Sequence, residues 1–157
     1  MRDKIFYYTF LKWGMEDVYN ISSVEAYQRL KDQADSALID VRTVEEFSSV
    51  GVPDLSDASA ELLLIPIYEA PHMELNPHFE NKVDEFIKNY EVNNLYFICR
   101  SGARSQTAAE LFKAKGYITF NVIDGFEGKM NDDGQRGLID GWKAAELPWR
   151  YSNVFKV

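Results

Sequence analysis

Segments typical of buried strands alternate with segments typical of helices along most of this chain of 157 residues. The strand-like segments are short apolar runs with branched or aromatic residues, at residues 37–41, 62–65, 95–98 and 119–123. Helical signals lie between them, at about residues 22–32, 43–50, 76–90 and 105–115. Such alternation across short links favours an α/β fold, with a mostly parallel sheet and helices on both faces. Ligands of these folds bind beyond the carboxyl ends of the strands.

Residues that favour helix ends mark several of these segments. Ser22 and Thr43 are each followed three residues later by glutamate, which is the spacing of a capping box. Asn76 stands before a proline, so it combines a favoured cap with a favoured first helical residue. We expect the helix over 105–115 to bury one apolar face, formed by Ala108, Leu111 and Phe112.

The charge balance and the cysteine count limit the partners and the compartment. The chain has 17 Lys and Arg against 25 Asp and Glu, a net charge of −8. Such a surface repels phosphate backbones and anionic lipid, so we expect neither a nucleic-acid nor a membrane partner. The one cysteine, Cys99, cannot form an internal disulfide. An unpaired cysteine fits a reducing compartment, and we expect a cytoplasmic protein.

Residues 1–17 contain an aromatic-rich run from Ile5 to Leu11. Lys12 interrupts this run before it reaches the length of a secretory signal, and no stretch of the chain approaches the roughly 20 apolar residues of a membrane span. We expect residues 1–17 to form an extension that packs on the core or forms an edge strand.

The segment around the cysteine joins the strand-like run at 95–98 to the following helix, and it reads Cys99-Arg100-Ser101-Gly102-Ala103-Arg104-Ser105. A tight loop at this place can turn its backbone N–H groups inward as an anion-binding nest. The helix that follows directs its positive dipole end at the same point, and the two arginines add full charge. All of these features stabilise a thiolate over a thiol, so we expect Cys99 to be a reactive nucleophile.

This loop and three further motifs, in the same order along the chain, resemble the rhodanese family of sulfurtransferases. The early motif is Leu38-Ile39-Asp40-Val41-Arg42 with Glu45-Glu46-Phe47. The later motifs are Val122-Ile123-Asp124-Gly125-Phe126 after Gly116-Tyr117, and a tryptophan-to-Leu-Pro ending from Trp142 to Trp149. The segment Gly51-Val52-Pro53-Asp54-Leu55 departs from the family's usual Gly-His-Ile sequence beside the site.

The resemblance implies one rhodanese-like domain over residues 18–150, with a five-stranded, mainly parallel sheet, followed by a tail at 151–157. It implies that Cys99 takes sulfur from a small anionic donor such as thiosulfate or 3-mercaptopyruvate and becomes a persulfide. A thiol, a protein acceptor or another nucleophile then collects that sulfur. No cofactor and no metal is expected, and the polar run at residues 131–134 lacks the ligand pattern of a calcium loop.

The expected roles follow the position of each residue. The substrate-binding group comprises the loop residues Arg100, Ser101, Gly102, Ala103 and Arg104. Their backbone N–H groups would hold the anion and the two arginines would attract it, although Arg104 has the alternative role of bracing the loop through a carboxylate. The expected structural residues are Asp40 and Arg42, as an ion pair at a strand end, and Ser105.

Other functions stay open at this point. A rhodanese-like chain can act as a persulfide carrier or a partner-docking module with little turnover of small molecules. Cysteine-dependent phosphatases and arsenate reductases also use an anion nest, but their loop has five residues between cysteine and arginine. Here four residues separate Cys99 from Arg104, which makes a smaller cradle that suits sulfur better than phosphate.

Overall fold

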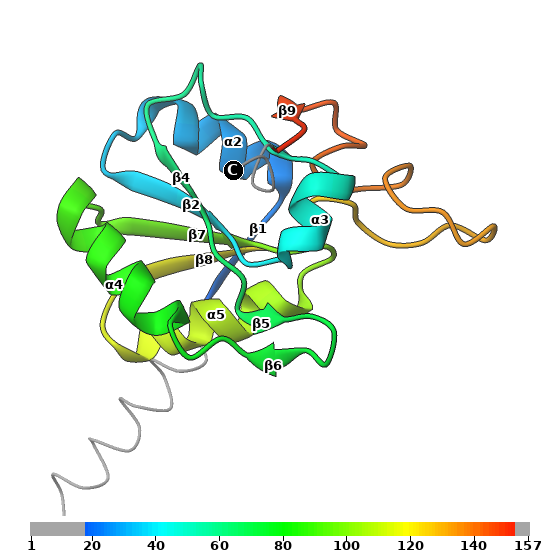
Figure 1. Ribbon diagram of the computed structural model, residues 1–157. Coiled ribbons are helices and arrows are strands. Elements are labelled where there is room, and N and C mark those ends of the chain that lie inside the picture. Colours follow the sequence, from blue (N-terminus) through cyan, green and yellow to red (C-terminus); the bar gives the residue numbers. More distant parts are fainter. Residues whose placement is uncertain (1–17, 153–157) are drawn as a thin grey trace, which may run out of the picture.

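The main sheet of the protein has five strands in the order β1-β8-β7-β2-β4, and every neighbouring pair is parallel. The computed structural model describes residues 18–152 (Figure 1). The strands of this sheet are β1 (Tyr19–Ile21), β2 (Ser36–Asp40), β4 (Glu61–Leu64), β7 (Asn94–Ile98) and β8 (Ile118–Val122). Two small antiparallel pairs accompany it, β3 (Val52–Pro53) with β9 (Trp149–Arg150) and β5 (Tyr68–Glu69) with β6 (Glu74–Leu75).

In the described part of the chain, four helices surround the sheet: α2 (Ser23–Asp32), α3 (Val44–Ser49), α4 (Phe79–Tyr90) and α5 (Ala103–Ala114). Helices α4 and α5 lie on one side of the sheet and α2 on the other, while α3 lies at the edge where the strands end (Figure 1). The core is divided accordingly. Alternate residues of β7 join the two layers, with Leu95 and Phe97 in the cluster under α4 and α5, and Tyr96 and Ile98 in the cluster with α2.

The α/β fold and its mainly parallel sheet are therefore confirmed. The apolar runs placed β2, β7 and β8 to within one residue at each end. Strand β1 has no such signal, because only three residues of it pair with β8 at an edge of the sheet. The expectation of a buried strand at 62–65 is wrong in one respect. Strand β4 is the opposite edge, and its leucines are only partly buried.

The two capping boxes turn out differently. Thr43 and Glu46 form the complete box at the beginning of α3. Ser22 accepts a hydrogen bond from the N–H of Glu25 and so caps α2, but the carboxylate of Glu25 binds Arg29 instead of returning to the cap. The second half of that box is absent because an i,i+4 ion pair competes for the same carboxylate.

Two helix starts differ from those expected. Helix α4 begins at Phe79, because Asn76 forms a turn in which its side-chain oxygen accepts from the N–H of His78. Helix α5 begins at Ala103, two residues early. Its buried face comprises Ser105, Ala108, Ala109 and Phe112, so the prediction that Leu111 is buried is wrong: this side chain is 36% exposed.

The expectation for residues 1–17 lies outside the described residues, as does most of the expected tail at 151–157. Within residues 18–152, no helix is long and apolar enough to cross a membrane.

Candidate active site

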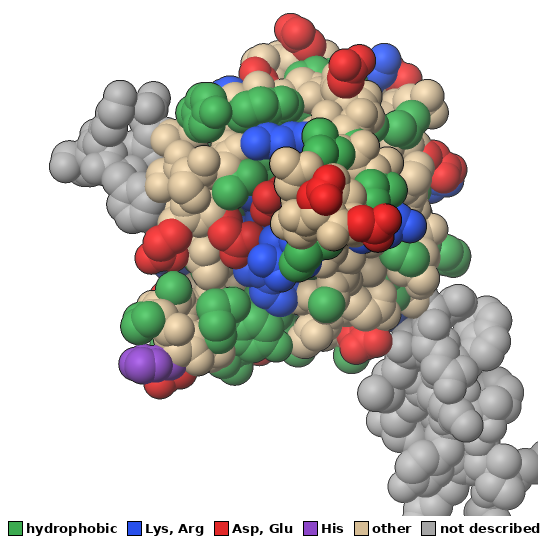
Figure 2. Space-filling model, turned by 90° about the vertical axis from the view of Figure 1, so that its right-hand side faces the viewer, with side chains coloured by type: hydrophobic (Ala, Val, Ile, Leu, Met, Phe, Trp, Pro, Cys, Tyr) green, Lys and Arg blue, Asp and Glu red, His purple; other side chains and the backbone are tan. Residues whose placement is uncertain are grey.

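Cys99 directly follows β7, at the edge where the parallel strands end. In the register of the sheet, the last residue of β7, Ile98, lies opposite Asp40 at the end of β2. Figure 2 views the molecule onto this edge, where basic side chains lie near the centre and acidic side chains lie next to them. The fold therefore brings the Cys99 loop and the Asp40–Arg42 segment together, although almost 60 residues separate them along the chain.

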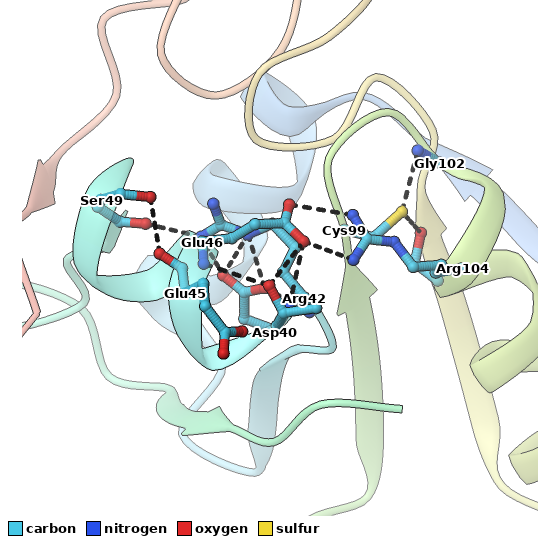
Figure 3. A network of polar contacts seen from close by, with 11 residues as sticks. Asp40, Arg42, Glu45, Glu46, Ser49, Cys99, Gly102 and Arg104 are labelled. Carbon is cyan, nitrogen blue, oxygen red and sulfur yellow. Dashed lines mark hydrogen bonds and ion pairs between the residues drawn. The ribbon is translucent and has the colours of Figure 1, made fainter. Parts of the chain in front are cut away.

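The Cys99 sulfur is enclosed by its own loop and the first turn of α5 (Figure 3). The N–H of Gly102 donates a hydrogen bond to Sγ over 3.1 Å, and the Ser105 hydroxyl also lies 3.1 Å from Sγ. The residue exposes 1% of its surface. Neither histidine of the chain hydrogen-bonds to this thiol, and its hydrogen-bond partners are a backbone N–H and a hydroxyl.

The peptide groups of the loop are oriented by the segment that follows β8. The carbonyl of Cys99 accepts from the N–H of Phe126, and that of Arg100 accepts from the N–H groups of Glu127 and Gly128. Within residues 18–152, the N–H groups of the other loop residues have no hydrogen-bond acceptor: Arg100, Ser101, Ala103 and Arg104. Unpaired donors at the beginning of a helix are the typical composition of an anion site.

A glycine is required at one position of this loop. Gly102 has φ of +108°, and a Cβ atom at this residue would lie 2.4 Å from the carbonyl oxygen of Ile123. The loop can pack this closely against the end of β8 only because residue 102 has no side chain. This contact also holds the Gly102 N–H in place toward the sulfur.

Arg104 does not extend into the loop. Its guanidinium forms two hydrogen bonds with the carboxylate of Glu46 on α3, at 2.7 and 3.0 Å (Figure 3). The two side chains expose only 17% and 21% of their surface. Because Glu46 also completes the cap of α3, one carboxylate links the Cys99 loop to that helix. This geometry fits the bracing role that was one of the two alternatives for Arg104.

The Glu46–Arg104 pair has a predictable effect on stability. Burial by itself raises the pKa of Glu46, but the hydrogen bond and charge of Arg104, together with the backbone N–H of Thr43 and the charge of Arg42, hold the pKa below the ordinary value of 4.5. A lowered pKa in the folded state stabilises the protein above the pKa of the unfolded chain, and this contribution disappears as pH falls through the folded value. We expect Glu46→Gln to cost about 1–2 kcal/mol at pH 7.

Urea unfolding at neutral pH and at about pH 3 measures this effect. The difference between wild type and Glu46→Gln should narrow at the lower pH, because pH 3 lies below the pKa of Glu46 in the unfolded chain and the stabilising contribution decreases there. Glu45→Gln is the matched control, because Glu45 is the exposed neighbour on the same turn and forms no ion pair within residues 18–152. A loss that is equal for both variants, or independent of pH, would contradict this account.

Arg42 and Asp40 form a buried ion pair, and both side chains are fully buried. Nε and one terminal nitrogen of Arg42 bind the carboxylate, and the same terminal nitrogen donates to the carbonyl of Gly51. The guanidinium lies 4.2 Å from the centre of the Phe126 ring. The pair thus joins the end of β2 to the residue before β3 and to the segment that orients the Cys99 loop.

The remaining loop residues differ in exposure. The side chains of Arg100, Ser101 and Ala103 are exposed, and within residues 18–152 no acidic side chain forms an ion pair with Arg100. Arg100 is therefore the loop arginine that is available to an approaching anion. The segment at residues 51–55, whose sequence departs from the family's usual one, contributes β3, which pairs with β9 beside α3.

Two contributors to the site were not identified from the sequence. Glu46 was assigned to a helix cap and to the early motif but not to the site, and nothing in the sequence indicates its contact with Arg104, 58 residues away. Asn121 hydrogen-bonds with Ser105 behind the sulfur. A signal for Asn121 did exist, because it is an amide residue within the mostly apolar run that became β8.

No group of three or more His, Cys, Asp and Glu side chains within residues 18–152 is arranged to hold a metal. The polar run at 131–134 forms a turn, in which the Asn131 side chain accepts from the N–H groups of Asp133 and Gln135.

Comparison with known proteins places this geometry in a family. The family model described as the STR4 middle domain matches residues 17–154. The Rickettsia prowazekii protein RP600 is 36% identical over 135 residues, covering 85% of this chain and 98% of that protein. The rice chloroplast protein Thylakoid Rhodanese-like is 29% identical over 130 residues, which are 82% of this chain and 24% of that protein.

A solved structure agrees with these relatives. The crystal structure of Rv0390 from M. tuberculosis superposes with a TM-score of 0.76 at 34% identity, covering 86% of this chain and 98% of that one. The shared fold supports a role in sulfur transfer or sulfur carriage. The chain belongs to the rhodanese-like family.

Proposed function

We propose that this protein is a sulfurtransferase that moves a sulfane sulfur from a small anionic donor to a nucleophilic acceptor through a persulfide on Cys99. The observation that carries the proposal is the loop around the sulfur. The carbonyls of Cys99 and Arg100 are bonded to the segment after β8, and the unpaired N–H groups of the loop lie at the beginning of α5. In a protein of net charge −8, this loop and Arg100 concentrate positive potential at one thiol.

Loading begins with attack of the Cys99 thiolate on the outer sulfur of thiosulfate. A bond forms between the two sulfur atoms, and the bond from the outer sulfur to the sulfonate breaks, with its electron pair leaving on sulfite. The negative charge of the thiolate then lies on the terminal sulfur of the persulfide. Backbone donors that are already in position stabilise this charge without reorganisation.

Each residue of the site has its own role in this proposal. Cys99 is the nucleophile, and the N–H groups from Arg100 to Arg104 hold first the donor and then the terminal sulfur. The exposed side chain of Arg100 attracts the donor, whereas Arg104 braces the loop through Glu46. Ser105 and the Asp40–Arg42 pair support the loop from behind and from β2.

Release requires a second nucleophile that attacks the terminal sulfur and leaves Cys99 as a thiolate. A thiol or a protein acceptor fits this role, and a reducing compartment keeps both thiols available. We therefore assign the protein to the cytoplasm and treat residues 18–150 as one rhodanese-like domain.

Turnover measurements test the proposal and separate an enzyme from a carrier. With thiosulfate alone, we expect release of about one sulfite per protein, because the reaction stops at the persulfide. With cyanide added as acceptor, sulfite release should continue and thiocyanate should accumulate. Release that stays at one sulfite with cyanide, but continues with a protein thiol acceptor, would identify a carrier. Absence of any sulfite release would overturn the proposal.

A further inference from the structure

A chain of two hydrogen bonds leads from the Cys99 sulfur into strand β8. The Ser105 hydroxyl lies 3.1 Å from Sγ and 2.6 Å from the side-chain oxygen of Asn121. Ser105 is fully buried and Asn121 is 2% exposed, so no solvent competes for these contacts. Three buried side chains are therefore linked through one hydroxyl group.

The backbone of the loop determines which groups donate and which accept in these two hydrogen bonds. The side-chain nitrogen of Asn121 donates to the carbonyl of Gly102 over 3.2 Å and to the side-chain oxygen of Gln106 over 3.0 Å. A carbonyl can only accept, so the nitrogen of the amide must face Gly102 and its oxygen must face Ser105. The amide oxygen has no proton either. The Ser105 hydroxyl is therefore the donor in its contact with Asn121.

This direction has a consequence for the sulfur. A hydroxyl has one proton, so Ser105 presents a lone pair to Cys99 while it donates to Asn121. A thiol can donate its proton to that lone pair. A thiolate has no proton to donate. It can accept a hydrogen bond from the Ser105 hydroxyl only if that hydroxyl no longer donates to Asn121. Asn121 and the thiolate compete for the same proton.

We propose that Asn121 is a positioning residue that holds the Ser105 hydroxyl away from Cys99 and thereby limits how readily the thiol ionises. Its part in the reaction rests on the proposed function. When an acceptor attacks the persulfide, the sulfur–sulfur bond breaks and its electron pair stays on Cys99. The hydroxyl then turns from Asn121 to the leaving thiolate, and it returns to Asn121 once the charge moves to a newly loaded terminal sulfur.

Charged side chains also lie on the elements packed around the loop. Arg104 at the beginning of α5 interacts electrostatically with Cys99. The other charged side chains on these elements are Arg100 on the loop, Asp40 and Arg42 at the end of β2, Glu46 on α3, and Asp124 and Glu127 after β8. Substitution of Asn121 or Ser105 changes none of these groups. Their contribution is therefore common to all the variants compared below.

The test is a pH titration of the thiolate by its ultraviolet absorbance, with Cys99→Ser as the blank, in the absence of any donor. Cys99 is the only cysteine, so the signal reports on this thiol alone. Asn121→Ala frees the Ser105 hydroxyl for the sulfur, and we expect the ratio of thiolate to thiol at a given pH to rise about fivefold. If Asn121→Ala does not fold, Asn121→Val removes the same acceptor with a residue that suits a strand.

Two controls separate positioning from general disturbance. In a Ser105→Ala background, Asn121→Ala should change the ratio by less than about twofold, because the group through which it acts is missing. Thr119→Ala is the matched structural control. Thr119 is fully buried on the same strand and its hydroxyl donates to the Ala109 carbonyl of α5, and this side chain forms no hydrogen bond with the loop. This variant should leave the titration unchanged.

An equal shift in both backgrounds, no shift, or a lower thiolate ratio in Asn121→Ala would overturn the proposal. Because no donor is present, the result does not depend on sulfur transfer. A protein that shows the shift but takes no sulfur from thiosulfate would retain the positioning role of Asn121 and lose the proposed function. A protein that takes up sulfur but does not show the shift would retain the proposed function and lose the positioning role of Asn121.

Discussion

Replacement of Cys99 by serine is expected to reduce sulfur uptake from thiosulfate on the order of a thousandfold or more, because it removes the attacking atom itself. A serine hydroxyl at this place is far less nucleophilic than a thiolate, and the site contains no histidine bonded to residue 99 that would activate it. Sulfite release from thiosulfate measures the rate.

The same variant should keep its fold. A serine can still accept from the N–H of Gly102 and bond with Ser105, so urea unfolding should differ by less than about 1 kcal/mol. Retention of sulfur uptake in a folded Cys99→Ser protein would contradict the role of the thiol. Hydrolysis of phosphate esters that depends on Cys99 would instead favour the phosphatase alternative.

The second large effect is expected at Gly102. In Gly102→Ala, the added Cβ lies 2.4 Å from the Ile123 carbonyl oxygen, and φ of +108° is a conformation that alanine rarely adopts. The loop must therefore move away from the end of β8 and take the Gly102 N–H away from the sulfur. We expect a loss of about 3 kcal/mol in stability and about a hundredfold in sulfur transfer, because small displacements of reacting groups reduce rates steeply.

Gly134→Ala is the matched control for this variant. Gly134 also has positive φ, +78°, but a Cβ there meets nothing within 4 Å. It should cost about 1 kcal/mol for the backbone conformation and leave sulfur transfer unchanged. Equal losses of transfer in the two variants would show that overall stability, and not the position of the loop, determines the rate.

The part of the fold that follows from local sequence was predictable. The apolar runs that became β2, β7 and β8, and the Thr43 cap of α3, are each specified within a few neighbouring residues. The loop at Cys99 was also accessible, because the strand before it, the helix after it and the arginines within it are consecutive in the chain. Their combined effect on an anion follows from elementary electrostatics.

What could not be predicted depends on contacts between distant segments. Three residues of β1 form a strand only because β8 supplies an edge for them. The sequence leaves two roles open for Arg104, attraction of a donor and bracing of the loop. Its contact with Glu46 depends on where the sheet places α3. The direction of the Ser105 hydroxyl depends on an amide in the next strand and a carbonyl in the loop.

The most direct test of the central claim is the mass of the intact protein after incubation with thiosulfate and removal of the excess reagent. We predict that the wild type gains the mass of one sulfur atom, that peptide mapping places it on Cys99, and that cyanide or a thiol removes it. Cys99→Ser should gain nothing under the same conditions. A folded wild-type protein that gains no sulfur, or gains it at a residue other than Cys99, would contradict the account.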